Sequence, residues 1–229
     1  MHCPASEERK RRLAGIAGLS GALLFFAGDM LFYGHFGSGA NFRQGMLDTV
    51  RRASEARLYA GGLVGPVAAC LCILGFWHVY RNVNPPHGFF ARLMLVCFAV
   101  LMIFGSAVHA LWTAKGLAIQ NCFGDDGVGC RALVSSVNSY WSLAYNLGAI
   151  PGYLGAILLV FLVLFGKTRY PKWTLFANPA FLILISPLAE RISAPFGAIF
   201  VGGSANLAIA FFFLVSILTT WKTAESASG

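Results

Sequence analysis

Six apolar stretches, each of spanning length, constrain this chain more than any other feature. A transmembrane helix needs about 20 predominantly apolar residues, and nearly all of the chain falls into such runs. We therefore predict an all-α, polytopic transmembrane helical bundle with six spans and short helical segments in the outer loops. It should form one domain over residues 1–229. The predicted spans are about 13–35, 58–80, 90–113, 140–165, 174–191 and 197–221.

Composition and charge agree with a membrane location. Of the 229 residues, 57% are hydrophobic and 11% are charged, against about 25% charged in soluble domains. The net charge of +8 comes from basic residues beside apolar runs, which predicts contact with lipid headgroups and no nucleic acid partner. The basic cluster Arg9–Arg12 and the loop Lys167–Lys172 place both termini in the cytoplasm of a multi-pass cell-membrane protein, with an uncleaved first helix.

Two predicted outer loops are longer than turns. Residues 36–57 have the pattern of an amphipathic helix on the headgroups, with Met46, Leu47 and Val50 facing inward. Residues 116–139 include Cys122 and Cys130, separated by a glycine-rich segment. If that loop is extracellular, the two cysteines should form a disulfide.

Asp29 is the most informative single residue. It lies in an otherwise apolar span, where a carboxylate costs on the order of 3 kcal/mol or more, so it needs a partner or a use. Other polar residues fall at a similar depth in the outer halves of different spans. Such groups either satisfy one another or surround a pocket. Pro66, Pro151 and Pro187 lie within spans and could open a cavity by kinking them.

We therefore predict a polar pocket in the outer half of the bundle. Asp29 and His109 are the candidate catalytic pair, as general acid and base, although no spacing rule places their helices in contact. The candidate ligand-binding residues are Ser106, Trp112, Tyr145, Asn146, Glu190, Ser204 and Asn206. His78, beside Trp77, is interpreted as an anchor at the opposite membrane interface.

No motif predicts a metal or cofactor. The spacing of Cys122 and Cys130 fits no common zinc pattern, and Asp125-Asp126-Gly127 lacks the ligand series of a calcium loop. The glycines of Gly61-Gly62 with Gly65, and of Gly148, Gly152 and Gly155, are instead typical of close helix packing.

Several segments resemble a family of uncharacterised bacterial multi-pass membrane proteins of about six helices. They are Gly28–Gly34, Leu63–Pro66, Gly75–Tyr80, Asn146-Leu147 and Asn206-Leu207. The resemblance covers most of the chain and implies no activity. Two other classes do not fit. Alkaline-ceramidase-like hydrolases need paired C-terminal histidines, and microbial rhodopsins need a retinal lysine in the last helix.

Three functions remain open. The favoured one is a site around Asp29 for a small amphipathic or lipid-like ligand, with or without acid/base chemistry. The second is a proton-coupled transporter of small molecules, and the third is a membrane scaffold or assembly subunit. The expected partners are membrane lipid and a lipophilic or amphipathic small molecule. The sequence does not decide whether the protein is an enzyme or forms a homo-oligomer.

Overall fold

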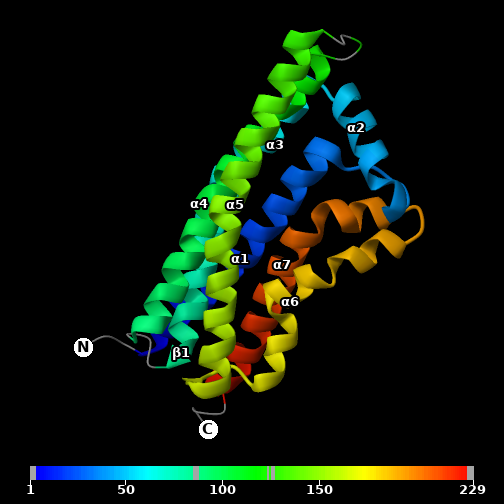
Figure 1. Cartoon of the computed structure of the whole chain (residues 1–229). Coiled ribbons are helices and arrows are strands. Elements are labelled where there is room, and N and C mark those ends of the chain that lie inside the picture. Colours follow the sequence, from blue (N-terminus) through cyan, green and yellow to red (C-terminus); the bar gives the residue numbers. More distant parts are fainter. Residues whose placement is uncertain (1–3, 85–87, 123, 125–126, 226–229) are drawn as a thin grey trace.

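The computed structural model describes residues 4–84, 88–122, 124 and 127–225, which form a bundle of long helices (Figure 1). The long helices are α1 (Pro4–Tyr33), α3 (Glu55–Asn82), α4 (Phe89–Asn121), α5 (Val128–Phe165) and α7 (Gly197–Glu225). The short elements are η1 (Gly39–Asn41), α2 (Phe42–Arg52), β1 (Val83–Asn84), β2 (Lys167–Thr168), η2 (Lys172–Ala177), α6 (Pro179–Leu184) and η3 (Ser186–Arg191). The predicted all-α class is confirmed, apart from one antiparallel pair of two-residue strands in which Val83 lies opposite Thr168.

Within the described residues, five helices are long and apolar enough to cross a membrane. These segments are Ser6–Tyr33, Glu55–Asn82, Phe89–Asn121, Val128–Phe165 and Gly197–Trp221. Their lengths of 25 to 38 residues correspond to about 38–57 Å at 1.5 Å per residue. That exceeds the roughly 30 Å hydrocarbon core of a bilayer. The helices therefore support a multi-pass membrane protein.

The predicted fifth span, residues 174–191, is not a continuous helix. It is divided among η2, α6 and η3. Asn178 caps α6 through its side chain, Pro179 begins that helix, and Pro187 lies at the start of η3. Proline removes a backbone donor and clashes with the preceding turn, so this apolar segment breaks. By contrast, α3 and α5 continue through Pro66 and Pro151.

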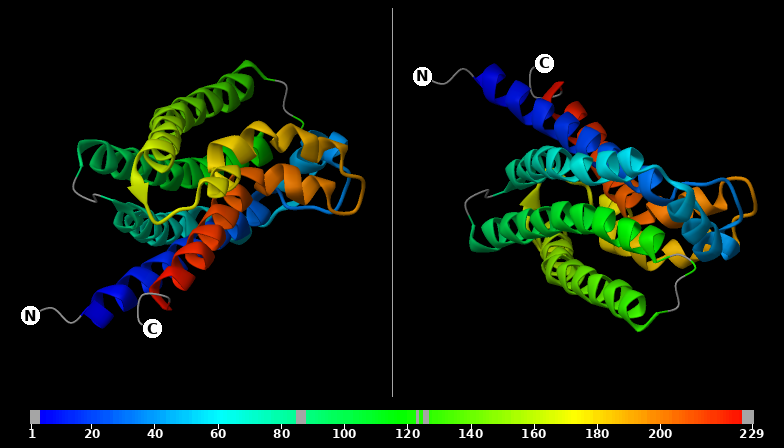
Figure 2. Two further views of the ribbon diagram at one scale, coloured as in Figure 1. Left: turned by 90° about the horizontal axis from the view of Figure 1, so that it is seen from below. Right: turned by 90° about the horizontal axis from the view of Figure 1, so that it is seen from above.

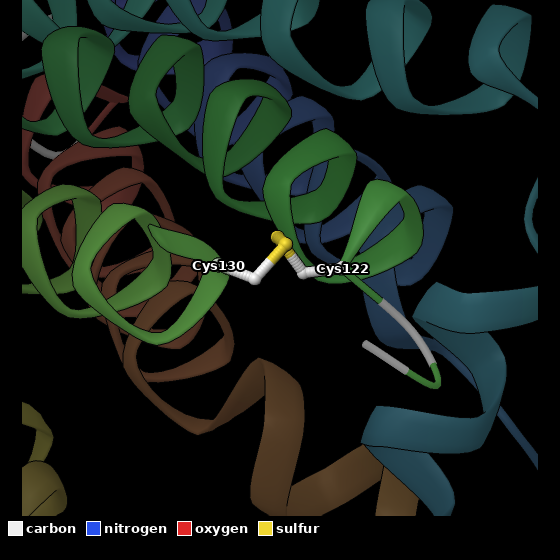
Figure 3. Close-up of a disulfide and its surroundings, with 2 residues drawn as sticks. All are labelled: Cys122 and Cys130. Carbon is white, nitrogen blue, oxygen red and sulfur yellow. A yellow bond between two sulfur atoms is a disulfide. The ribbon is translucent and has the colours of Figure 1, made fainter. Parts of the chain in front are cut away.

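The second predicted outer loop is largely helical. Helix α4 continues to Asn121 and α5 begins at Val128, so residues 116–121 and 128–139 extend two helices rather than forming a loop. These extensions are too polar to be recognised as apolar runs, yet they lack proline. The predicted disulfide between Cys122 and Cys130 joins the two helix ends, with a Cα–Cα distance of 5.4 Å (Figure 3). Asp125 and Asp126, which were considered for calcium, lie outside the described residues.

Helix α2 confirms the expected helix in the first outer loop. It covers Phe42–Arg52, and its Val50 is buried while Met46 and Leu47 are half-buried. The Gln120 amide of α4 donates hydrogen bonds to the carbonyls of Val50 and Ala53, at 2.8 and 2.6 Å. These bonds attach the end of α2 to α4.

The packing order places α1 between α3 and α7, and α4 between α3 and α5 (Figure 2). The α1–α3 crossing depends on glycine. A Cβ placed on Gly18 would lie 2.5 Å from the Cα of Gly75, which no side chain tolerates. The glycine seams predicted from the sequence do pack helices: Gly62 faces Thr113 of α4, and Gly152 of α5 faces Leu101.

The two ends of the bundle differ. Helix α1 begins and α7 ends at the end that also holds β1 and β2, which we call the terminal end (Figure 1). There the Arg12 guanidinium lies 4.4 Å from the centre of the Trp221 ring. The other end, with α2 and the Cys122–Cys130 bond, is called the disulfide end. The segment from η2 to η3 carries the chain from the terminal end toward the disulfide end (Figure 1).

Candidate functional site

Asp29 lies near the disulfide end of α1 and is only 7% exposed. The amide nitrogen of Asn206 on α7 donates a hydrogen bond to its Oδ2 atom at 2.6 Å. One turn further along α1, the Tyr33 hydroxyl donates to the carbonyl of Gly202 at 3.3 Å and also interacts with the Asp29 carboxyl. The buried carboxyl is therefore held between α1 and α7.

His109 of α4 faces Asp29 from the other side. Its Nε2 lies 3.6 Å from Asp29 Oδ1, within ion-pair distance but longer than a hydrogen bond. Its Nδ1 lies 3.4 Å from the carbonyl of Gly61 on α3. A carbonyl only accepts, so Nδ1 carries a hydrogen, and a neutral His109 would turn a lone pair toward Asp29. The pair therefore needs one shared proton, on the carboxyl or on the imidazole.

Glycines on two helices make the space for His109. A Cβ on Gly28 of α1 would lie 2.9 Å from its Cε1 atom, and a Cβ on Gly65 of α3 would lie 2.7 Å from its Cβ. The imidazole thus sits in a notch between α1 and α3. The sequence indicated close helix packing through its glycines, but it did not predict that the His109 side chain would occupy the space beside them.

Arg57, which the sequence analysis did not select, holds the end of α1. Its side chain donates to the carbonyls of Leu31 at 2.6 Å, Met30 at 2.9 Å and Gly34 at 3.4 Å. Met30 and Leu31 belong to the last turn of α1 and Gly34 follows it, and a helix end of this kind favours a positive charge. The arginine therefore fixes the helix end from which Asp29 projects. An arginine just before an apolar span was its only sequence signal.

A cavity of about 380 Å³ adjoins this cluster, within the 300–1,000 Å³ range of small-molecule sites. Asp29, Tyr33, His109 and Asn206 form part of its wall, and most of the rest is apolar or aromatic. Helices α1, α3, α4, α5, α6 and α7 contribute side chains, while Phe42 and Met46 of α2 close it toward the disulfide end.

The cavity reaches the outer surface of the bundle beside α5. Tyr145 and Tyr153 line it and are 47% and 42% exposed. Helix α5 packs mainly on α4, whereas the opposite wall belongs to α6 and α7. The mouth therefore lies between α5 and these two elements, on a side covered by apolar side chains.

Aromatic rings and one cation border the cavity near α2. Trp112 and Trp141 both line it, with ring centres 5.9 Å apart. The Lys115 ammonium lies 4.5 Å from the centre of each ring, a cation–π arrangement. The buried indole nitrogen of Trp141 has no hydrogen-bond partner among the described residues. It is a donor that an occupant of the cavity could use.

The predicted site residues divide into two groups. Those that line the cavity are Asp29, His109, Trp112, Tyr145 and Asn206. The others do not. Ser106 lies against Gly65 of α3, Asn146 is exposed on α5, Glu190 is exposed in η3, and Ser204 is half-buried on α7. Helical phase separates Ser106, Asn146 and Ser204 from the cavity, because neighbours one or two residues from a lining residue face elsewhere. In the part of the chain that the structure describes, no group of three His, Cys, Asp or Glu residues is placed to hold a metal ion.

A second buried polar cluster lies near the terminal end, around His78. This residue is 1% exposed, so its interpretation as an interfacial anchor is wrong. Its Nδ1 donates to the carbonyl of Arg11 at 2.8 Å, and its Nε2 lies 3.1 Å from Ser216 Oγ and 3.2 Å from the amide of Asn82. Tyr170 bonds to the same Ser216 hydroxyl at 2.8 Å. We call His78, Asn82, Tyr170 and Ser216 the His78 network.

Three contacting phenylalanines lie between the cavity and that network. Phe76 packs on Phe98 with ring centres 4.1 Å apart, and on Phe213 at 5.0 Å. All three are at most 1% exposed. Phe76 and Phe98 also line the cavity, so they form its floor toward the terminal end.

Comparison with known proteins adds a family but no activity. No curated protein and no solved structure matches the chain. A family model described as "Family of unknown function (DUF6796)" matches residues 6–223, which include all the residues of the cavity and of the His78 network. The chain therefore belongs to this family of unknown function.

Proposed function

We propose that this protein is an integral membrane protein that binds a small amphipathic or lipid-like molecule in the Asp29 cavity. The supporting observation is the wall of that cavity. A mainly apolar and aromatic surface carries one buried carboxyl, one imidazole and one amide, all from helices of membrane-spanning length. Such a wall suits an occupant with an apolar body and one polar group.

The proposal includes an orientation. The η2–η3 segment would make a sixth, interrupted crossing, which is tolerated where irregular backbone is buried in protein or faces a cavity. Both termini would then lie in the cytoplasm of a cell-membrane protein, with Arg9, Lys10 and Arg12 near the anionic leaflet. The disulfide end would face the outside, where a bond between Cys122 and Cys130 persists.

The occupant would reach the cavity from the lipid. The mouth lies beside Tyr145 and Tyr153 on an apolar side of α5, and α2 covers the end that would face external water. An amphipathic molecule of the outer leaflet could insert its polar group toward Asp29 while its apolar part remains among the rings and the lipid.

Filling the cavity tests the proposal. Gly105 lines the cavity, and a Cβ placed there meets only Phe25, at 3.6 Å. Gly105→Leu should therefore fold, because leucine also favours helix over glycine, and it should occupy the space. Gly129→Leu is the matched control, because a Cβ there has no atom of the described residues within 4 Å and the residue lies outside the cavity.

The measurement is mass spectrometry of molecules that co-purify with each variant from the same membranes. Wild type and Gly129→Leu should retain an amphipathic molecule that Gly105→Leu loses. Equal retention by all three, or none by wild type, would contradict the proposal. Proteoliposomes test the alternative of a proton-coupled transporter. Because the phenylalanine floor blocks a route toward the terminal end, proteoliposomes that contain the wild-type protein should show no proton-coupled flux.

A further inference from the structure

The geometry points to a ligand class for this cavity: an amphiphile whose polar group is a protonated primary or secondary amine. This inference rests on the proposed function and makes it more specific. It starts from two atoms that face each other, Asp29 Oδ1 and His109 Nε2, 3.6 Å apart.

These two atoms are both acceptors once the Gly61 carbonyl has fixed the hydrogen of His109 on Nδ1. A nitrogen that carries two N–H bonds can lie about 2.8 Å from both atoms, because two hydrogen bonds of that length can reach across the 3.6 Å that separates the two acceptors. A primary or secondary ammonium has these two donors. An alcohol has one donor and no charge, and a quaternary ammonium has no donor.

The exchange balances in charge. The empty pair holds one proton and is neutral overall. When an ammonium enters with its own hydrogens, the carboxylate balances its charge, His109 stays neutral as an acceptor, and the shared proton leaves to solvent. One proton is therefore released for each ammonium bound, and binding tightens as pH rises while the amine remains protonated.

Other groups around the pair do not compete for this role. On α1 and α5 the titratable neighbours in the wall are Tyr33, Tyr145 and Tyr153. The lining residues of α2, α3, α6 and α7 carry no charge. Two cations lie nearby outside the wall: Arg57 binds the carbonyls of α1, and Lys115 lies over the two indole rings. Asp29 is thus the one anionic group in the described wall.

The aromatic surface also favours a cation. The rings of Phe25, Tyr33, Tyr145 and Tyr153 line the cavity, and the Phe25 ring centre is 4.8 Å from that of His109. Aromatic faces attract cations, more strongly where water is excluded. Lys115 shows that the Trp112 and Trp141 rings already serve in this way.

Three probes with the same chain test the inference: dodecylamine, dodecyltrimethylammonium and dodecanol. Binding is measured by native mass spectrometry of the full chain in uncharged maltoside micelles, with proton release followed by an indicator dye. Dodecylamine should bind one per protein and about tenfold or more tighter than the other two, as expected for a charge-assisted hydrogen bond. About one proton should be released per amine bound.

Variants locate the preference. Asp29→Asn and, separately, His109→Gln should abolish the preference for dodecylamine, while Asp48→Asn, which removes an acidic group of α2 outside the cavity, should keep it.

Added phosphatidylethanolamine separates the sources of the ammonium, since it displaces dodecylamine if the natural ligand is an aminophospholipid and not if it is a free amine. Equal binding of the three probes by wild type, or a preference that survives Asp29→Asn, would overturn the inference. If wild type retains a molecule that Gly105→Leu loses but shows no preference, only the amine assignment fails.

Discussion

The Asp29 cavity and the His78 network are two buried clusters of similar composition at different depths of one bundle. Each contains a histidine and an asparagine, and each brings together groups of α1, α3 and α7. Along α1 they lie about 27 Å apart, taking Arg11 and Asp29 as markers and 1.5 Å per residue. The difference between them is how completely the histidine is bonded.

Both nitrogens of His78 have protein partners within 3.2 Å. Among the described residues, the polar partners of His109 are the distant carbonyl of Gly61 and a carboxylate beyond hydrogen-bonding distance, and His109 faces a cavity. A cluster whose histidine is bonded at both ring nitrogens contributes cohesion and a single geometry. A cluster with an open position beside free space is arranged to accept something else. Residue type alone therefore does not separate structure from function in these spans.

The largest expected effect tests the closed cluster. His78→Leu should lower the free energy of unfolding by about 2–4 kcal/mol, because it removes the hydrogen bonds of the imidazole to Ser216, Asn82 and the Arg11 carbonyl in a packed interior. Unfolding in detergent with a denaturing surfactant measures it. The control is Asp29→Asn, which keeps the shape of the open cluster and should change stability by less than about 1 kcal/mol. Equal losses in both variants would remove the distinction between the two regions.

Gly28→Val addresses the open cluster with a smaller loss of stability. The new side chain would clash with the His109 ring, whose Cε1 lies 2.9 Å from an added Cβ. Overpacking of this kind costs about 1–3 kcal/mol. It should also displace the imidazole from Asp29, so ligand retention should fall more than stability does. Gly129→Ala is the control with open space, and retention that survives Gly28→Val would show that His109 is not part of the site.

Arg57→Met should have a moderate effect on the same region. It preserves an unbranched side chain but removes the donors to three carbonyls at the end of α1. We expect the free energy of unfolding to fall by about 1–2 kcal/mol and the affinity for dodecylamine to decrease. Thermal unfolding with and without dodecylamine measures both. Arg52→Met, on the exposed end of α2, should be neutral. If both behave alike, the end of α1 does not need its arginine.

The sequence predicts much of the bundle because lipid imposes a simple rule on helices. Asp29, in an apolar run, indicated a polar site, and the spacing of Cys122 and Cys130 indicated the disulfide. The sequence did not predict the continuation of α4 and α5, since helices that leave the bilayer need not be apolar. The sequence also did not predict that the span 174–191 is interrupted at Pro179. The span was recognised by its hydrophobicity, which does not show that a backbone hydrogen-bond donor is missing.

The contact between Asp29 and His109 lay beyond the sequence for another reason. It depends on which helices are neighbours, and that depends on glycine faces that fit several partners equally well. The function of His78 was misjudged in the same way. A histidine near tryptophan and arginine resembles an interfacial residue until α1, α7 and Tyr170 are placed around it.

The smallest expected effect concerns Tyr170 and would show whether the His78 network is closed. Its side chain lies outside the spanning helices, and burial raises the pKa of its hydroxyl, against the opposing influence of hydrogen bonds from Ser216 and Asn82. Because the folded pKa lies above the unfolded value near 10, the hydroxyl stabilises the fold fully below about pH 10 and loses that contribution as pH rises further. Tyr170→Phe should therefore cost about 1 kcal/mol at pH 8. It should also make stability fall less steeply than in wild type between about pH 10 and pH 11. Parallel pH profiles for the two proteins would mean that water reaches the Tyr170 hydroxyl, and the network would then be as open as the cavity.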